Sequence, residues 1–222
     1  MVFEIRNLTL DDYDQAMFLE STAFYNRPSP ERTELMRKWF PPSWTLGGFL
    51  DGKLVADVRA TPFIRRMDGV ETPFAAVGPV ASLAAYRRQG YAGQVLTASL
   101  AQMRERGQAL SGLFTPHDAL YRRYGWERAE AKLGYSFPPR DVRLRFRSSG
   151  GRTVPGMADD WQRLEPIYEQ QMASGNGPYK RSAVWWNEAI THDYENDKRI
   201  ERDVVLWVND AGEDRGYMVY KH

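Results

Sequence analysis

The chain has 222 residues, 42% apolar and 27% charged, which is typical of a water-soluble globular protein with one domain or one domain and part of another. Its 30 Lys and Arg residues and 29 Asp and Glu residues give a net charge of +1, so no global charge attracts it to nucleic acid or to a membrane surface. It has no cysteine and only three histidines, His117, His192 and His222, far apart in the sequence. Disulfides and a cysteine nucleophile are therefore excluded, and no metal site is expected.

The first forty residues are predicted to form a strand and two helices. Residues 2–9 alternate apolar and polar side chains, as in a strand, and Thr9 precedes a helical pattern over residues 10–24. A second helix ends near Trp39 and Phe40, before two prolines. The start of the chain has no signal-peptide pattern, and no apolar run is long enough to span a membrane. We therefore expect a cytoplasmic protein.

The central part of the chain alternates strand and helix patterns. Residues 44–69 contain two strands joined by Asp-Gly-Lys, a typical hairpin signal. Residues 71–83 are predicted to form a third strand, in which Gly78 and Pro79 indicate either a bulge or a close approach of another group to the backbone. A basic turn, "YRRQG", then leads into an amphipathic helix over residues 91–106. A short strand at 109–115, a short helix at 117–125, and one or two strands within 126–137 complete this half of the chain.

Residues 138–156 mix Pro, Gly, Ser and Arg without a stable period and are predicted to be a linker between residues 1–137 and 157–222. After the linker the order of elements starts again. Asp159, Asp160 and Trp161 follow Asp11, Asp12 and Tyr13 at a constant separation, and the last residues resemble the earlier hairpin. We interpret 157–222 as a partial second copy of the first unit. Because that copy stops at its third strand, either it packs against the first unit or the chain is a fragment of a longer protein, and we favour the fragment.

The turn before residue 91 combines glycine with positive charge at the start of a helix. The first amides of a helix have no intrahelical partner and carry partial positive charge, so this position favours a phosphate. Gly90 permits a close approach to the backbone, and Arg87 and Arg88 add charge. The turn is neither a Walker loop nor a dinucleotide fingerprint. Alone, it leaves two readings open: an anion site or an ordinary tight turn.

Two motifs together resemble the GNAT acyltransferases. Arg87-x-x-Gly90-x-Ala92, directly after a strand, resembles the pyrophosphate-binding motif of that family, and "YRRYGW" at 121–126 resembles its second aromatic-glycine signature. The resemblance covers roughly residues 3–137. It implies an α/β (α+β) fold with a twisted mixed sheet that is splayed at an acetyl-CoA site. Within the superfamily, the sequence looks most like the enhanced-intracellular-survival (Eis) acetyltransferases, whose chains contain two GNAT-like halves.

The resemblance implies a role for each part of the cofactor site. Backbone groups of Val80, Ala81 and Ser82 would bind the acetyl and pantetheine groups of acetyl-CoA, the co-substrate. The pyrophosphate would lie on a second set of residues, namely Arg87, Arg88, Gln89, Gly90, Tyr91, Ala92 and Gly93. Tyr121 corresponds to the tyrosine that protonates the departing thiolate, and a phenol is protonated at neutral pH, as a general acid must be. Tyr124 is the competitor for this role, and both tyrosines could instead be packing residues.

The acceptor side is less defined. Trp39 and Phe40 are expected to border the acceptor cleft, because the loop between the first two helices does so in GNAT folds, although such aromatics are also common in cores. Pro116 and His117 stand where the Eis proteins commonly have Ser-Glu, so His117 is either near the acceptor amine or only a helix-start residue. Glu20 and Asp118 are the candidates for a general base.

The sequence therefore predicts a GNAT-type N-acetyltransferase that uses acetyl-CoA to acetylate an amine. The acceptor would be a small molecule, aminoglycoside-like or polyamine-like, or a lysine side chain. The alternative is a non-catalytic CoA-binding or structural module. No nucleic-acid or membrane partner is expected, and the oligomeric state is left open, a homo-oligomer included.

Overall fold

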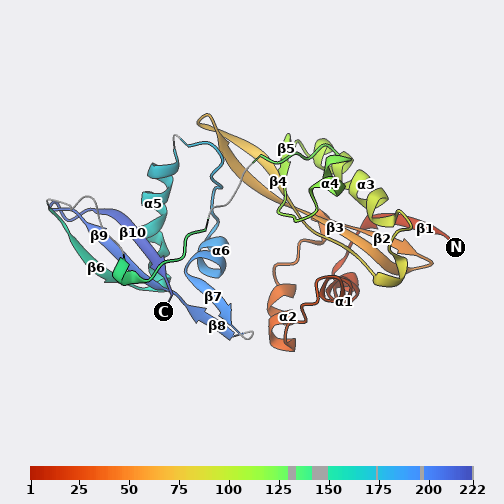
Figure 1. Cartoon of the computed structure of the whole chain (residues 1–222), viewed down its shortest axis with the longest axis horizontal. Helices are drawn as coiled ribbons and strands as arrows, with labels where there is room; N and C mark the ends of the chain where they lie inside the picture. The colour runs from red at the N-terminus through yellow and green to blue at the C-terminus, as the bar shows by residue number, and fades with distance from the viewer. Residues whose placement is uncertain (130–133, 142–149, 174, 196–197, 222) are drawn as a thin grey trace. The chain divides into compact units, whose positions relative to one another are not determined.

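The computed structural model describes residues 1–129, 134–141, 150–173, 175–195 and 198–221 (Figure 1). The chain divides into two compact units. Unit 1 comprises Met1–Phe114 and the later segments Ala173–Lys180 and Tyr194–Lys198. Unit 2 comprises Thr115–Met172, Arg181–Asp193 and Arg199–His222. The compact units thus differ from the sequence boundaries, since residues 115–137 group with the second unit.

Unit 1 is built around one five-stranded sheet with the order β1-β2-β3-β4-β5. All neighbouring strands are antiparallel except the parallel pair β4–β5, so the predicted mixed α/β fold is confirmed. Its helices and strands are, in chain order, β1 (Phe3–Asn7), α1 (Tyr13–Ala23), α2 (Pro30–Arg37), β2 (Thr45–Leu50), β3 (Lys53–Met67), β4 (Val70–Ser82), α3 (Tyr91–Glu105) and β5 (Leu110–Gly112).

Two Asp-Gly pairs close the hairpins of this sheet. Asp51 and Gly52, between β2 and β3, have φ of 48° and 81°. Asp68 and Gly69, between β3 and β4, have φ of 49° and 77°. Two successive residues with positive φ form the turn whose twist matches that of the flanking strands, and Asp-Gly is a preferred sequence for it. The predicted Asp-Gly-Lys hairpin is therefore confirmed.

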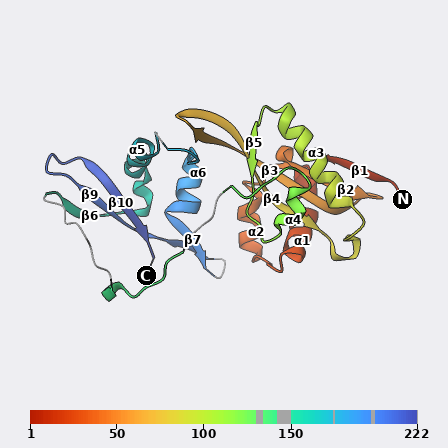
Figure 2. The same ribbon diagram turned by 45° about the horizontal axis from the view of Figure 1, so that its top comes forward.

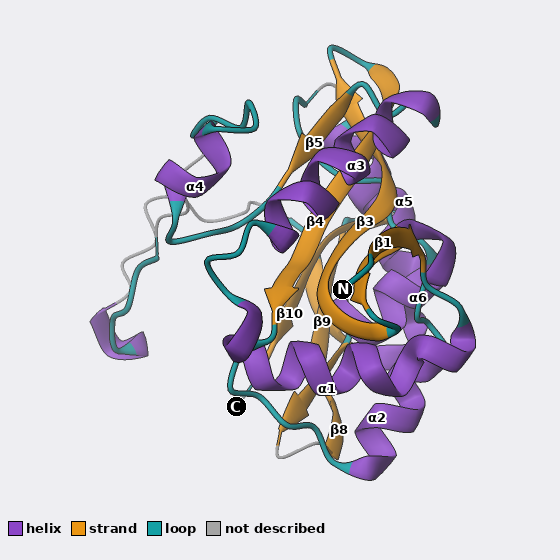
Figure 3. Cartoon of the chain, turned by 90° about the vertical axis from the view of Figure 1, so that its right-hand side faces the viewer, coloured by secondary structure: helices purple, strands orange, loops and turns teal. Residues whose placement is uncertain are grey.

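The helices of unit 1 cover both faces of its sheet, α1 and α2 one face and α3 the other (Figures 2 and 3). Two neighbouring glycines of β2 show the alternation. A side chain at Gly47 would meet Leu8, which belongs to the core beneath α1, whereas one at Gly48 would meet Val95 of α3. Glycine at these two positions lets both layers approach the strand closely.

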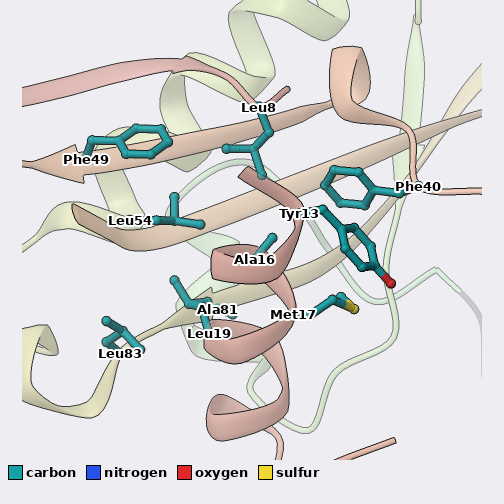
Figure 4. Packing of buried hydrophobic residues seen from close by; sticks show 10 residues of the cluster. All are labelled: Leu8, Tyr13, Ala16, Met17, Leu19, Phe40, Phe49, Leu54, Ala81 and Leu83. Carbon is teal, nitrogen blue, oxygen red and sulfur yellow. The ribbon is translucent and has the colours of Figure 1, made fainter. Parts of the chain in front are cut away.

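The core between α1 and the sheet contains one contiguous cluster of buried side chains (Figure 4). Tyr13, at the start of α1, contacts Phe40 edge to face, with ring centroids 5.1 Å apart. The members of the cluster are Leu8, Tyr13, Ala16, Met17, Leu19, Phe40, Phe49, Leu54, Ala81 and Leu83. Because Ala81 and Leu83 lie at and just beyond the end of β4, this core fixes the end of the strand that leads into the basic turn.

Unit 2 contains a three-stranded antiparallel sheet with the order β10-β9-β6 and a core formed by Leu164, Tyr168, Trp186, Val204 and Leu206. Along the chain the remaining helices and strands are α4 (Asp118–Arg122), β6 (Arg152–Gly156), α5 (Trp161–Met172), α6 (Ala183–Trp185), β7 (His192–Glu195), β8 (Lys198–Glu201), β9 (Asp203–Val208) and β10 (Asp214–Tyr220). A π-helix at Trp186–Ile190 continues α6, and β7 pairs with β8.

The strands expected within residues 126–137 are absent from the described residues 126–129 and 134–137, so this prediction was wrong for those positions. The rest of that run, 130–133, lies outside the described residues. A strand requires a neighbouring ladder, and within the described part of the chain no named strand pairs with these positions. The alternating pattern alone was therefore not sufficient.

Candidate functional site

The sheet of unit 1 opens between β4 and β5. β4 pairs with β3 along most of its length, from Val70 to Ser82, but with β5 only from Phe74 to Ala76. Beyond Ala76, β3 is the only strand among the described residues with which β4 pairs. The edge of β4 that faces away from β3 is therefore open at Val80, Ala81 and Ser82, and its backbone groups can bind an extended ligand.

A bulge lies at the start of this open stretch, where the sequence predicted one. The β3–β4 register shifts between Val58 and Ala60, opposite Gly78 and Pro79. Gly78 has a φ of 149°, and Pro79 has no N–H to donate. The predicted bulge is thus confirmed, and it re-aims the strand just before Val80.

The basic turn connects β4 to α3. A 3₁₀ turn at Ala84–Tyr86 follows the strand, and α3 begins at Tyr91. Gly90 has a φ of 84° and Arg88 a φ of 64°, a left-handed conformation that is uncommon for a residue with a side chain. The Gly90 carbonyl accepts the first intrahelical bond, from the Gln94 N–H at 3.1 Å. This geometry leaves the first amides of a 15-residue helix directed out of its end.

The side chains of the turn are exposed. Arg87 Nε donates to the Ser82 carbonyl at 3.4 Å, and Gln89 Nε2 donates to the Ala85 carbonyl at 3.3 Å. Within the described residues neither Arg87 nor Arg88 forms an ion pair with a carboxylate. Two guanidinium groups and the positive end of the α3 dipole therefore act at one place, which fits a phosphate group.

Tyr121 lies on the five-residue helix α4, in unit 2. Its ring packs edge to face against Trp126, with centroids 6.0 Å apart. Burial raises the pKa of the Tyr121 hydroxyl above its usual value of 10. The phenol is therefore protonated at neutral pH. Tyr124, the competing residue, lies two positions beyond the end of α4, so the two tyrosines do not share a helix.

Two further predicted residues flank α4. His117 is exposed and immediately precedes the helix, with its N–H donating to Thr115 Oγ1 at 2.9 Å and its carbonyl accepting from the Leu120 N–H at 3.0 Å. Asp118 forms an ion pair with Arg128. Its carboxylate is therefore already occupied by a guanidinium group, which does not favour Asp118 as a base.

Trp39 and Phe40 follow α2 in unit 1. Trp39 is 39% exposed, whereas Phe40 is 8% exposed and belongs to the core cluster. The Arg59 guanidinium lies 5.1 Å from the centroid of the Phe40 ring. Phe40 thus packs between the core and a partly buried charged side chain.

A pocket of about 200 Å³ lies between α1 and α2, and we call it the α1–α2 pocket. Of the described residues that line it, Glu20 is the only acidic one. Its lining residues are Met17, Glu20, Ser21, Phe24, Asn26, Pro28, Arg32 and Met36. Neither Trp39 nor Phe40 lines this pocket.

Glu20 belongs to a buried charged cluster with Asp57 and Arg59 of β3. Arg59 forms an ion pair with Glu20, and Asp57 is fully buried. Both oxygens of the Asp57 carboxyl are without a hydrogen bond among the described residues, although the Glu20 carboxyl and the Ala81 backbone lie close to it. Burial and the Glu20 charge raise the pKa of Asp57 well above its usual range, against the opposing effect of Arg59. Burial likewise raises the pKa of Glu20.

Sequence reasoning named Glu20 but missed Asp57 and Arg59. A signal for all three was present. Glu20 follows Tyr13, Ala16 and Met17 on the buried face of α1, at a position where the helical spacing predicts an apolar side chain. Asp57 and Arg59 alternate within β3, in a run of otherwise buried residues.

The structure therefore brings together in unit 1 the residues from Val80 to Gly93, while Tyr121 and His117 belong to unit 2. Among the described residues no group of three or more His, Asp or Glu could hold a metal ion. None of the described helices is both long and apolar enough to cross a membrane.

Comparison with known families matches residues 4–129 to the family described as "Acetyltransferase (GNAT) domain". The match covers more than half of the chain, and the protein belongs to this family. The open edge of β4 and the basic start of α3 lie within the matched residues.

Curated relatives agree with this assignment. An uncharacterized N-acetyltransferase of Streptomyces avermitilis is 27% identical over 174 residues, which are 75% of this chain and 42% of that protein. One from Streptomyces griseus is 25% identical over 203 residues, or 85% of this chain and 47% of that protein. The chain thus spans less than half the length of these relatives.

Solved structures share the fold. A protein from Enterococcus faecalis V583 described as a "Probable N-Acyltransferase" has a TM-score of 0.84 at 24% identity, covering 100% of this chain and 56% of that one. Eis1 from Mycobacterium abscessus has a TM-score of 0.74 at 21% identity, covering 98% and 53%.

Proposed function

We propose that the protein is an acetyl-CoA-dependent N-acetyltransferase whose acceptor is an amine of a small molecule, aminoglycoside-like or polyamine-like, or of a lysine. One observation carries the proposal. The open edge of β4 runs directly into a helix start that has positive charge and a left-handed glycine. An extended ligand with a phosphate at one end matches this order of groups.

The proposed roles follow the geometry. Backbone groups of Val80, Ala81 and Ser82 hold the acetyl and pantetheine parts in the place of a missing β5 ladder. The pyrophosphate is held by the turn and the first α3 amides, from Arg87 to Gly93. Acetyl-CoA supplies the acetyl group as a thioester. A backbone amide directed at the developing oxyanion contributes about 3 kcal/mol to such a reaction.

Tyr121 is proposed as the general acid, because its hydroxyl stays protonated at neutral pH. The acceptor side is proposed to include Trp39, Phe40 and His117. The side chains of Trp39 and His117 are exposed, whereas Phe40 belongs to the core cluster. The Eis-like specificity rests on the two sequence motifs, and the fold shared with Eis1 is compatible with it.

We further propose that residues 157–222 are a partial second GNAT-like unit, joined to 1–137 by the predicted linker 138–156, whose last residues form β6 and belong to the sheet of this unit. The order β6, α5, β9, β10 repeats the order β1, α1, β2, β3, with the same antiparallel neighbours. A local detail supports the repeat. Asp12 accepts a hydrogen bond from the Thr9 N–H at 2.8 Å, and Asp160 accepts one from the Met157 N–H at 3.0 Å.

Acetyl-CoA binding is tested by thermal denaturation. A ligand at a hundred times its dissociation constant adds about 2.7 kcal/mol, which corresponds to a rise in melting temperature of roughly 5–10 °C. Gly90→Ala is expected to reduce that rise, because a Cβ there occupies the proposed phosphate position. Gly107→Ala is the matched control, since Gly107 follows the other end of α3 with a φ of 74° and equally open space. An equal loss of ligand stabilisation in both variants contradicts the assignment of the turn.

Catalysis is tested by thiol release from acetyl-CoA with spermidine, kanamycin or a lysine peptide as acceptor. Tyr121→Phe is expected to lower kcat by about 10²-fold or more while leaving stabilisation by acetyl-CoA unchanged. Stabilisation without thiol release from any acceptor favours the alternative, a non-catalytic CoA-binding module. Unchanged turnover in Tyr121→Phe removes that residue from the proposed role.

A further inference from the structure

A buried carboxyl lies next to the stretch of β4 that is assigned to the acetyl group. Asp57 of β3 is fully buried and is in register with Ala81 of β4. The side chain of Ala81 belongs to the core cluster beneath α1 (Figure 4). Residues that are directly opposite in an antiparallel pair point to the same face of the sheet, so Asp57 also faces α1. Asp57 thus lies between α1 and the end of β4.

Arg59 extends this buried cluster along the same stretch of β4. The pairs Val58–Val80 and Ala60–Val77 flank the register shift, so Arg59 is the residue of β3 that lies opposite the bulge at Gly78 and Pro79. Its guanidinium forms an ion pair with Glu20 of α1. The cluster therefore connects α1 to β3 exactly where β4 changes its direction and loses its β5 neighbour.

The charges of the cluster indicate which carboxyl carries a proton. Glu20 and Asp57 share one guanidinium, so ionisation of both would leave a net negative charge in surroundings of low dielectric, which is unfavourable. Glu20 is the carboxyl that pairs with Arg59, and Asp57 is therefore the neutral one. The pKa of Asp57 agrees with this assignment, since burial is the main cause that raises it.

A neutral carboxyl has one O–H to donate and one carbonyl oxygen to accept with. The two polar groups close to Asp57 match these needs: the Glu20 carboxylate is an acceptor on α1, and the Ala81 backbone N–H is a donor on β4. Among the described residues, neither Asp57 oxygen has a hydrogen bond of normal geometry. A buried polar group without a hydrogen bond lowers the stability of the fold, and such residues are expected where they serve a function.

We propose that Asp57 is a positioning residue for acetyl-CoA: its carboxyl donates a hydrogen bond to Glu20 and accepts one from the Ala81 N–H, which fixes Ala81 relative to α1 when acetyl-CoA lies along β4. Asp57 does not touch the ligand, because its side chain lies in the core layer and the proposed ligand lies along the edge of the strand. Its proton stays in place throughout. The inference rests on the proposed function and adds to it the residue that sets the geometry of the open edge.

The test combines calorimetry of acetyl-CoA binding to the full chain with the melting temperature measured without ligand. Asp57→Val removes both hydrogen-bonding groups and retains a side chain that suits a strand. Its dissociation constant for acetyl-CoA is expected to rise at least tenfold. Its melting temperature is expected to stay the same or to rise, because an apolar side chain replaces an unsatisfied buried polar one. A merely structural Asp57 would give the opposite pattern, a lower melting temperature and an unchanged dissociation constant.

Two further substitutions at the same position separate hydrogen bonding from volume. Asp57→Asn presents an N–H to Glu20 and a carbonyl to the Ala81 N–H, as the neutral carboxyl does, so its dissociation constant is expected to stay within about threefold of wild type. Asp57→Ala adds no volume and is expected to weaken acetyl-CoA binding as much as Asp57→Val. It replaces the valine variant if that variant does not fold.

Thr45→Val is the matched control for damage to the same layer. Thr45 is fully buried, and its hydroxyl donates to the Pro41 carbonyl at 3.0 Å. It is in register with Arg59, but its strand β2 is not a neighbour of β4. The substitution is expected to lower the melting temperature and to leave the dissociation constant for acetyl-CoA within twofold of wild type.

The outcomes distinguish failure of this inference from failure of the proposed function. Unchanged acetyl-CoA affinity in both apolar variants overturns the inference and leaves the proposed function in place. The same holds if Asp57→Asn or Thr45→Val loses as much affinity as Asp57→Val, because the effect would then not depend on the proposed hydrogen bonds. If wild type does not bind acetyl-CoA, the proposed function itself fails, and the inference fails with it.

Discussion

The buried carboxylate of Asp12, directly before α1, binds Arg6 of β1 and Thr9. It accepts two hydrogen bonds from the Arg6 guanidinium of β1, at 2.7 and 2.9 Å, and two from Thr9, at its N–H and its hydroxyl. The paired guanidinium is the main cause of a pKa that lies far below the ordinary value of a carboxyl. The side chain thus holds the chain entering α1 against the first strand.

Replacing Asp12 by Asn is expected to lower the free energy of unfolding by roughly 1–3 kcal/mol at pH 7, because it removes the ion pair and weakens the cap. A lowered native pKa stabilises the fold above the unfolded pKa of about 3.9, and this contribution is lost as the pH falls below it. Urea denaturation of wild type and Asp12→Asn should therefore differ at pH 7, and the difference should narrow progressively below about pH 4 and close only as the pH falls through the much lower native pKa. Asp11→Asn, exposed and adjacent, is the control; an equal loss there contradicts the argument.

For single charged residues, the sequence predicted where they lie in a helix or strand but not always which side chain they pair with. Asp11 and Asp12 were expected near the start of a helix, since charge and spacing are local signals. The Glu20–Arg59 pair joins residues 39 positions apart, and Asp57 comes from the same strand as Arg59. Local patterns could mark each of these residues as unusual for its position, but only the assembled sheet brings the three side chains together.

Element formation was more predictable, because its signals are short in range. The period of α3, the Asp-Gly turns and the Gly78-Pro79 bulge all lie within a few residues of the feature that they determine. The segment at 176–180 shows the opposite case. Its Lys180 N–H donates to the Ile64 carbonyl at 2.9 Å, and the Arg66 N–H donates to the Pro178 carbonyl at 3.0 Å. A sequence pattern cannot indicate a pairing over more than a hundred residues.

This segment covers an edge of β3 that β2 leaves exposed, since β2 pairs with β3 only from Lys53 to Arg59. Tyr179 anchors it: its ring contacts Phe63 and Phe74, at 5.3 and 5.5 Å between centroids, and the Arg65 guanidinium lies 5.2 Å from its centroid. A single aromatic side chain thus joins the segment to both strands of the long hairpin.

Tyr179→Ala is expected to release the segment while the rest of unit 1 stays folded. Amide hydrogen exchange should accelerate at least tenfold at Arg66 and Lys180, whose N–H groups form the ladder, and remain unchanged in α3. Tyr25→Ala serves as the control, because Tyr25 is 89% exposed in a loop of the same unit. Unchanged exchange at Arg66 in Tyr179→Ala would show that the backbone pairing does not depend on this anchor.

Among the described residues each of the two units has a buried hydrophobic cluster of its own, and this arrangement determines how the effect of a core substitution spreads. Leu19 of α1 and Leu164 of α5 are both fully buried, and each belongs to a different core cluster. Leu→Ala in a close-packed core costs about 2–5 kcal/mol through lost burial and the cavity left behind. The two substitutions are therefore matched in chemistry and burial and differ only in the unit that they affect.

Leu19→Ala is expected to weaken hydrogen-exchange protection in β2, β3 and α3 and to reduce stabilisation by acetyl-CoA, because this core holds the end of β4. Leu164→Ala is expected to weaken protection in β6, β9 and β10 and to leave ligand stabilisation of unit 1 in place. Each unit has its own sheet and its own buried cluster, so local opening should follow these boundaries. Equal loss of protection across both units in either variant would show that the two cores unfold as one cooperative structure.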